Sequence, residues 1–133
     1  MEVARAGAQV GRASRIVEYN GVLYFDMHGA AGATERPMSM YEQATVLLHR
    51  YDELLAQYGS DKRHILRAEI VLRSADDLDE FNRAWTEWVE DGYQPARATH
   101  TGSVLPAGML VGIFVTAAKK AACFFPATAK KRG

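Results

Sequence analysis

The amino-acid sequence predicts an α+β fold in which two helices cover one face of a mixed sheet. Two segments, residues 39–58 and 74–92, repeat apolar residues at helical spacing. Short runs rich in β-branched or aromatic residues precede, separate and follow these segments, which gives the order β-β-α-β-α-β-β. With 133 residues, of which 48% are apolar, the chain is long enough for one domain over residues 1–133 with its own core.

A tight hairpin is expected at the start of the sheet. The apolar runs at residues 16–18 and 22–25 flank Asn20 and Gly21. Both of these residues tolerate the positive φ of a two-residue hairpin turn. Residues 29–37 follow and contain two glycines and a proline, so they are expected to form a loop.

The first helix has signals at both of its ends. Ser39 and Glu42 form a capping-box pattern, in which each side chain satisfies a free amide at the helix start. Gly59 is a natural stop, because glycine readily adopts the left-handed conformation after a helix. Between these ends one apolar stripe recurs at helical spacing, made of Ala44, Leu47, Leu48, Tyr51, Leu54, Leu55 and Tyr58.

The second half of the chain alternates strands with one helix. Residues 64–73 alternate apolar and charged side chains, as in a strand with one buried face. Acidic residues at 74–77 favour the start of a helix, whose stripe is Leu78, Phe81, Trp85 and Trp88. Pro95 suits the first position of a strand that runs to Thr101. Residues 110–116 are almost all apolar, which predicts a strand buried on both faces.

One face of this sheet is expected to lack a cover. Two helices cover only one side, and Val111, Ile113 and Val115 of the last strand are expected on the bare side. An exposed apolar patch of this kind usually marks an interface, and most interfaces of soluble oligomers join identical chains. The sequence therefore predicts self-association.

Charge is balanced over the whole chain but not along it. The 16 basic residues equal the 16 acidic ones, but five of the bases follow residue 117 with no acid among them, so residues 1–117 carry about −5. The basic tail at residues 119–133 is read as a solvated terminus. Nucleic-acid arms usually interleave aromatic and basic residues, whereas Phe124 and Phe125 stand apart from both basic clusters. We expect no nucleic-acid partner.

The sequence favours a cytoplasmic protein without a membrane partner. Cys123 is the only cysteine, which excludes an intrachain disulfide framework and fits a reducing compartment. The longest apolar run, residues 109–115, is far shorter than the roughly 20 residues that a membrane span needs. The chain does not open with the basic and then apolar pattern of a signal sequence.

Three stretches carry a family resemblance. They are Asn-Gly-Val-Leu-Tyr-Phe at residues 20–25, Asp-Leu-Asp-Glu-Phe-Asn-Arg-Ala-Trp at 77–85, and Pro-Ala-Arg-Ala-Thr at 95–99 followed by Leu105-Pro106. Their order and spacing over about residues 12–118 resemble the reactive-intermediate deaminase (Rid) family, also called the YjgF or L-PSP family.

The resemblance implies a chorismate-mutase-like fold, a homotrimeric barrel and a ligand cleft at each subunit interface. It also implies hydrolysis of enamines and imines derived from amino acids, which yields 2-oxo acids and ammonia without metal or cofactor. The implied homotrimer agrees with the bare sheet face.

The resemblance assigns site residues on the fifth strand and the second helix. Arg97 is the implied catalytic residue, because the planar guanidinium can bind the carboxylate of an imino acid through two hydrogen bonds. Asn82 matches an asparagine of the family's cleft and lies at the edge of the helical stripe, and the alternative is a polar residue on the solvent side of the helix. Thr99 lies two residues after Arg97 and is expected on the same face of the strand.

The sequence departs from the deaminase pattern where water would be activated. The closing-strand acid of the family falls on Phe114, and an acidic position two residues earlier falls on Gly112. The family's tyrosine before the hairpin falls near Ala13, and its Ser-Gly pair falls on Asp26 and Met27. Neither phenylalanine nor glycine can act as a base, so Phe114 is expected only to line the ligand cleft.

Asp26 and His28 are candidates for replacing the missing acid. Histidine titrates near neutral pH and can transfer protons. The alternative is that both are ordinary loop residues. As metal ligands the two supply too few donors, so no metal site is expected.

Two functions remain open at this point. One is an imine or enamine hydrolase with an altered active site, and the other is a trimer that binds a small carboxylate without catalysis. The older ribonuclease label of the family is disfavoured by the negative charge of residues 1–117, since nucleic-acid binding depends on phosphate contacts.

Overall fold

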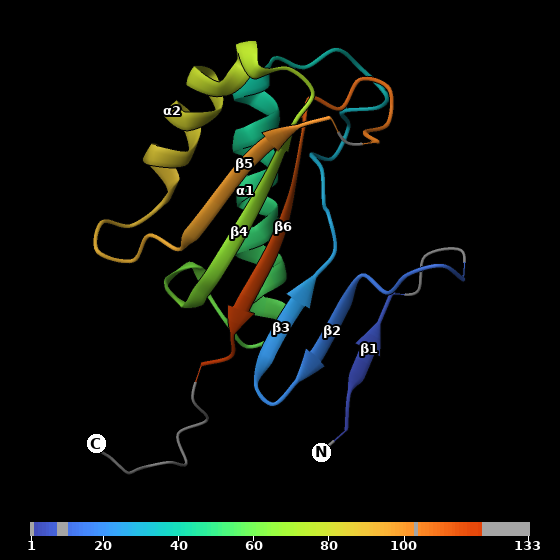
Figure 1. Cartoon of the computed structure of the whole chain (residues 1–133), viewed down its shortest axis with the longest axis vertical. Coiled ribbons are helices and arrows are strands. Elements are labelled where there is room, and N and C mark those ends of the chain that lie inside the picture. Colours follow the sequence, from blue (N-terminus) through green and yellow to red (C-terminus); the bar gives the residue numbers. More distant parts are fainter. Residues whose placement is uncertain (1, 8–10, 103, 121–133) are drawn as a thin grey trace.

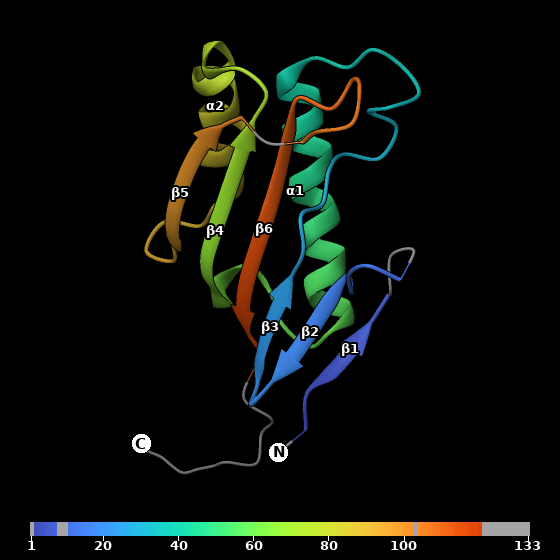
Figure 2. The same ribbon diagram turned by 45° about the vertical axis from the view of Figure 1, so that its right-hand side comes forward.

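The computed structural model describes residues 2–7, 11–102 and 104–120. In this part of the chain, six strands form one sheet and both α-helices lie on the same side of it (Figure 1, Figure 2). The elements are β1 (Ala4–Ala6), β2 (Ile16–Tyr19), β3 (Val22–Phe25), α1 (Met40–Gln57), the 3-10 helix η1 (Lys62–His64), β4 (Ile65–Leu72), the 3-10 helix η2 (Ala75–Asp77), α2 (Leu78–Trp88), β5 (Ala96–Thr101) and β6 (Val111–Ala118).

The sheet is mixed, as predicted. Its strand order is β1-β2-β3-β6-β4-β5. Strands β4 and β5 are parallel and are joined through α2, whereas every other neighbouring pair is antiparallel. The α+β fold class is therefore confirmed, and the closing strand β6 lies in the middle of the sheet.

The first strand is the element that the sequence did not predict. Residues Ala4–Ala6 pair antiparallel with β2 and add an edge strand. This strand has only three residues, and none of them is β-branched or aromatic. Local propensity therefore gives no sign of it, and its pairing with β2 supplies the structure.

The start of α1 carries half of the predicted capping box. The Oγ of Ser39 accepts a hydrogen bond from the backbone N–H of Glu42 at 3.1 Å. The carboxylate of Glu42 instead accepts a bond from Arg36 at 2.6 Å. The helix is followed by Gly59 with φ +80°, the left-handed conformation expected of a stop signal.

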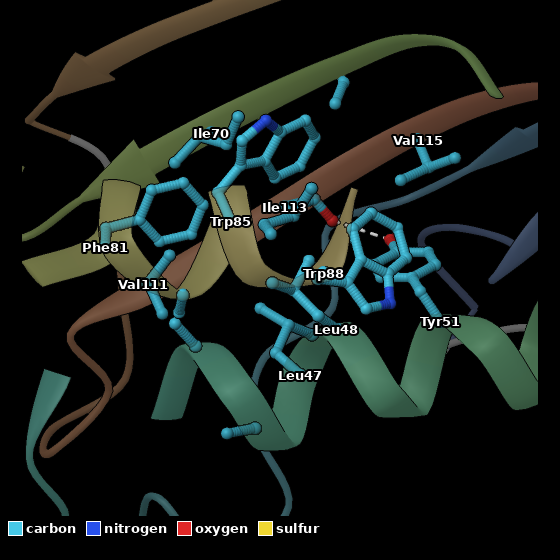
Figure 3. Packing of buried hydrophobic residues seen from close by; sticks show 14 of the residues in the cluster. Leu47, Leu48, Tyr51, Ile70, Phe81, Trp85, Trp88, Val111, Ile113 and Val115 are labelled. Atoms are coloured by element: carbon cyan, nitrogen blue, oxygen red, sulfur yellow. Dashed lines mark hydrogen bonds between the residues drawn. The ribbon is translucent and has the colours of Figure 1, made fainter. Parts of the chain in front are cut away.

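The core lies between the sheet and the two helices (Figure 3). The expectation that Val111, Ile113 and Val115 face the bare side is wrong, because all three are buried within this core. The physical reason is the register: β6 pairs Val111, Ile113 and Val115 with Leu72, Ile70 and Ala68, whose side chains face the helices.

The bare face of the sheet carries a different set of side chains. Phe114 and Tyr24 alternate with buried neighbours and are 37% and 47% exposed. Gly112 lies on the same face as Phe114, and a methyl group at this position would lie 2.5 Å from the Sδ of Met27. The thioether of Met27 therefore covers the strand at Gly112.

Among the described residues, no helix is long and apolar enough to cross a membrane. The start of the basic tail lies beside the sheet, where Lys119 forms an ion pair with Glu18 at 3.2 Å. The rest of the predicted tail, from residue 121 onward, lies outside the described residues.

Candidate functional site

Arg97 lies on the edge strand β5 and faces the helical layer. The register pairs Arg97 with Ala68 and Thr99 with Ile70, and both of these β4 residues are buried beneath the helices. Pro95 immediately precedes the strand, where its missing N–H interrupts no ladder bond. The strand therefore directs the guanidinium of Arg97 toward α2.

Side chains of β5 and α2 surround this guanidinium. The Nη2 of Arg97 donates to the Oδ1 of Asn82 at 2.6 Å, and its Nε donates to the Oγ1 of Thr99 at 3.1 Å. The Cζ lies 5.4 Å from the ring centre of Phe81 and 5.3 Å from that of Trp85. The three residues that the sequence assigned to one cleft are thus in contact.

The partners of Arg97 are neutral. Among the described residues, no carboxylate forms an ion pair with this guanidinium. Burial lowers the pKa of Arg97 from its ordinary value, although an arginine remains charged. A half-buried cation without an acidic partner favours an anion, and a guanidinium matches a carboxylate through two parallel hydrogen bonds.

His28 belongs to the core and is only 2% exposed. Its Nδ1 donates to the backbone carbonyl of Asp26 at 3.0 Å, and the hydroxyl of Tyr51 lies 3.3 Å from the same nitrogen. Tyr51 donates to the carbonyl of Ile113 at 2.7 Å, which ties α1 to β6 (Figure 3). In this chain His28 therefore has almost no surface to offer a ligand.

The environment keeps both aromatic groups of this cluster neutral. Burial lowers the pKa of His28, and the nearby charge of Arg15 lowers it further against opposing contributions from Asp26. Burial also raises the pKa of the Tyr51 hydroxyl well above its ordinary range. Both side chains act here as neutral hydrogen-bonding groups within the core.

Asp26 and Phe114 line a second candidate site, separate from the surroundings of Arg97. Both line a cavity of about 480 Å³ between the loop after β3, the loop before β6 and the bare face of the sheet. Asp26 forms an ion pair there with Arg15, at 3.4 Å. The structure thus brings Asp26 and Phe114 together, apart from Arg97.

The two groups occupy opposite sides of the sheet. Arg97 faces the helices, whereas Phe114 lies between the core residues Ile113 and Val115 and points to the other side. One chain therefore does not place Arg97 and Phe114 in a single cleft.

Several site residues had no signal that singled them out in the sequence. Phe81 and Trp85 were predicted as core, and they also form the apolar platform beneath Arg97. Arg15 and Arg50 line the cavity but belong to no motif. Within the described ranges, no group of three or more His, Cys, Asp or Glu side chains is arranged to hold a metal ion.

The fold and the arginine site define a class of small α+β proteins, and the comparisons identify the family. The sequence model of the family described as endoribonuclease L-PSP matches residues 4–119. A RutC family protein of Haemophilus ducreyi is 35% identical over 107 residues, which cover 80% of this chain and 89% of the relative. The chain therefore belongs to the L-PSP family, also named YjgF or Rid.

A solved structure agrees with this assignment. The crystal structure of a YjgF family protein from Neisseria meningitidis matches with a TM-score of 0.81 and 34% identity, over 92% of this chain and 98% of that one. A more distant relative is named for its activity: a 2-iminobutanoate/2-iminopropanoate deaminase of Capra hircus is 26% identical, over 85% of this chain and 84% of the relative.

Proposed function

We propose that this protein hydrolyses 2-imino acids derived from amino acids, with Arg97 holding the substrate carboxylate. The observation that carries the proposal is the half-buried guanidinium of Arg97, which Asn82 and Thr99 orient and no described carboxylate neutralises. The name of the goat relative supports the reaction class, because it is a deaminase of small 2-imino acids.

The reaction adds water to the carbon of the C=N bond. The water oxygen bonds to this carbon, protons move to the nitrogen, and the C–N bond breaks to release ammonia and leave a 2-oxo acid. The role of Arg97 is to fix the carboxylate beside the reacting carbon, which reduces the entropic cost of the reaction. Its charge also favours binding of the anionic substrate.

We further propose that a neighbouring copy completes the cleft in a homotrimer. Arg97 and Phe114 face opposite sides of one chain, so they line a common cleft only where two copies meet. The partly exposed aromatic side chains of the bare sheet face supply apolar surface for such contacts.

A second function is carboxylate binding without hydrolysis. The observation that favours it is the closing strand, where Phe114 and Gly112 occupy the positions at which the resemblance places acids. Neither side chain can activate water.

The test generates a 2-imino acid from its amino acid with an amino-acid oxidase and follows the imine by competition with semicarbazide. The protein is expected to divert imine to 2-oxo acid and ammonia, and Arg97→Ala is expected to lose most of this effect. Loss of a charged hydrogen-bonding partner is worth ~1.5–3 kcal/mol, or about 10–100-fold in rate. Arg36→Ala is the matched control, because Arg36 is exposed and pairs with Glu42.

The result separates the two functions. Equal imine loss with wild type, Arg97→Ala and no protein excludes hydrolysis of that substrate. If a 2-oxo acid still raises the Tm of the wild type but not of Arg97→Ala, the binding function stands.

A further inference from the structure

A separate hollow, here named the interhelical groove, lies between α1 and α2. Its volume is about 300 Å³, and side chains of α1, α2 and the 3-10 helix η1 line it. The two helices lie side by side (Figure 1, Figure 2), and the groove extends along α1 from Tyr41 to Asp52. No described residue belongs both to this groove and to the cavity at Phe114 or the contacts of Arg97.

Two carboxylates in the groove are held by neutral aromatic donors. The indole N–H of Trp88 donates to both oxygens of Asp52, at 3.1 Å each. The hydroxyl of Tyr41 donates to Glu87, and this bond raises the pKa of the phenol. In the described part of the chain, neither carboxylate forms an ion pair. Both negative charges are therefore oriented without being neutralised.

The cations near the groove do not form ion pairs with these carboxylates. The Nζ of Lys62 donates to the carbonyl of Trp88 at 2.8 Å and lies 5.3 Å from the centre of its ring. The Cζ of Arg83 lies 3.7 Å from the ring centre of Tyr41, outside the wall of the groove. With one lysine against two acids, and histidine counted as neutral, the wall carries a charge of about −1. Aromatic rings beside carboxylates favour a basic and partly apolar occupant.

The described chain ends beside the η1 end of this groove. The Oγ of Ser60 donates to the carbonyl of Ala118 at 2.6 Å, and the backbone N–H of Lys120 donates to the carbonyl of Gly59 at 2.9 Å. Ser60 is buried and lies only two residues before Lys62 of the groove wall. Figure 1 shows that β6 and α1 end at the same edge of the molecule. Residue 121 therefore follows directly from a point close to the groove.

The sequence after Lys120 has the composition that such a groove favours. Residues 121–133 contain Phe124 and Phe125, then Lys130, Lys131 and Arg132, and no acid. These three bases face a body, residues 1–117, with a charge of about −5. The two are therefore complementary in charge.

The length of this segment is sufficient to follow the whole groove. An extended chain spans at most roughly 3.3–3.6 Å per residue, or about 45 Å for residues 121–133. The eleven residues from Tyr41 to Asp52 correspond to a helical rise of about 17 Å. The phenylalanines come first along the chain, so they reach the Trp88 end of the groove before the basic residues reach Glu87.

We propose that residues 121–133 bind in the interhelical groove of the same chain. Phe124 and Phe125 lie against Trp88, and the basic residues at 130–132 supply positive charge to Asp52 and Glu87. This interaction differs from the solvated terminus that the sequence alone predicts. It uses none of the residues around Arg97, so it goes beyond the proposed function.

The test is limited trypsin digestion of the full chain, with mass spectrometry of cleavage after Lys130 and Lys131. A bound segment is protected, so the cleavage rate follows the unbound fraction. The double variant Asp52→Asn, Glu87→Gln is expected to be cleaved about threefold faster or more, the effect of losing two partly exposed charge pairs. The double variant Glu53→Gln, Asp79→Asn is the matched control, because it removes one acid from each helix outside the groove. Its cleavage rate is expected to equal that of the wild type.

Alkylation measures the apolar end of the segment independently. Cys123 is the only cysteine, so its reaction with the neutral reagent iodoacetamide reports on this segment alone. We expect alkylation to be several-fold slower in the wild type than in Asp52→Asn, Glu87→Gln. The double variant Phe124→Ser, Phe125→Ser is expected to lose this protection as well, because it removes the apolar contact with Trp88.

A salt series on the wild type keeps the test decisive without any variant. At about 1 M salt, where the screening length is roughly 3 Å, the cleavage rate is expected to approach that of the free peptide of residues 121–133 under the same conditions. The proposal is overturned if the wild type is cleaved and alkylated as fast as the free peptide at low salt. It is also overturned if the control pair loses protection as much as the groove pair, or if protection increases with protein concentration. None of these results affects imine hydrolysis at Arg97.

Discussion

The side chains that accept hydrogen bonds from Arg97 are neutral, so the positive charge of the guanidinium is available to an anionic ligand. Buried charges are usually paired with an opposite charge, since desolvation of an isolated ion is costly. Here the amide of Asn82 and the hydroxyl of Thr99 orient the guanidinium without neutralising it. A ligand carboxylate would supply the missing charge.

Replacing Asn82 by aspartate tests this argument directly. Asn82→Asp puts a carboxylate at nearly the same place, 2.6 Å from the Nη2 of Arg97 in the present geometry. The internal ion pair then competes with the ligand, so affinity for 2-oxobutanoate is expected to fall about tenfold or more. Calorimetric titration measures the affinity.

The stability of the same variant provides its control. The new ion pair is expected to leave the Tm unchanged or raise it, because it compensates a half-buried charge. Asn82→Asp protein that is as stable as wild type and binds 2-oxobutanoate equally well would contradict a carboxylate site at Arg97.

His28 gives a prediction for the pH dependence of stability. Burial lowers its folded-state pKa below the ordinary value of 6.5. Below pH 6.5 the unfolded chain takes up a proton at this residue before the folded chain does, so protonation favours unfolding. The stabilisation that neutral His28 contributes is complete above 6.5 and is lost as the pH falls from there toward the folded-state pKa.

The measurement compares wild type with His28→Asn in urea unfolding between about pH 5 and pH 8. Asparagine keeps a donor for the carbonyl of Asp26 and cannot take up a proton in this range. The difference in free energy of unfolding between the two proteins is expected to shrink as the pH falls below 6.5. If the difference in free energy of unfolding between the two proteins is constant over this pH range, the protonation of His28 does not affect stability and the prediction is wrong.

At the scale of elements, the start of α1 shows that one sequence pattern contains two separable interactions. Ser39 caps the helix, whereas Glu42 pairs with an exposed arginine and leaves the reciprocal bond of a capping box unformed. Ser39→Ala is therefore expected to lower the free energy of unfolding by about 1 kcal/mol. Glu42→Gln is expected to cost at most about half of that, because exposed ion pairs contribute little. Chemical denaturation of both variants measures the two losses in free energy of unfolding. Equal losses would contradict this prediction and would indicate that Glu42 also caps the helix.

The strands show where sequence patterns succeed and where they stop. The Asn20-Gly21 turn was predicted because local chemistry determines it. The predicted alternation of β4 holds over residues 67–70, but the apolar Leu66 is 50% exposed at the bulge between Ile65 and Arg67. Strand β6 is apolar at nearly every position, so its pattern does not tell which side chains face the helices. Pairing with Ala68, Ile70 and Leu72 decides this, and pairing is a long-range property.

The candidate site also has a part that the sequence predicted and a part that it did not. The Pro-Ala-Arg motif and the Asn82 position led to Arg97 through the resemblance to the family, whose motifs each lie within one short segment of the chain. The cavity at Arg50 was not predicted, because its residues come from the segment before β2, the loop after β3, α1, the loop before β6 and β6 itself. No single segment contains enough of that cavity to form a pattern.

At the scale of the whole molecule, the bare face of the sheet remains the strongest argument for self-association. The aliphatic residues first expected there are core residues, but Tyr24 and Phe114 take their place and are partly exposed. Leu66, at the bulge where β4 pairs with β6, adds further exposed apolar surface. Burying such side chains gains about 1.5–3 kcal/mol each for full burial, so a partner copy is expected to cover them.

Two kinds of substitution on this sheet should therefore have different effects. Tyr24→Asp places a charge on the bare face, and it is expected to convert a homotrimer of 14.7 kDa chains into folded monomers. Ile113→Asp buries an unpaired carboxylate under α1 and α2, and it is expected to unfold the chain. Light scattering gives the mass and circular dichroism gives the fold. Thr86→Asp, which adds a charge to the exposed side of α2, should change neither. A wild-type protein that stays monomeric at micromolar concentration would contradict the trimer, and with it the cleft in which Arg97 and Phe114 meet.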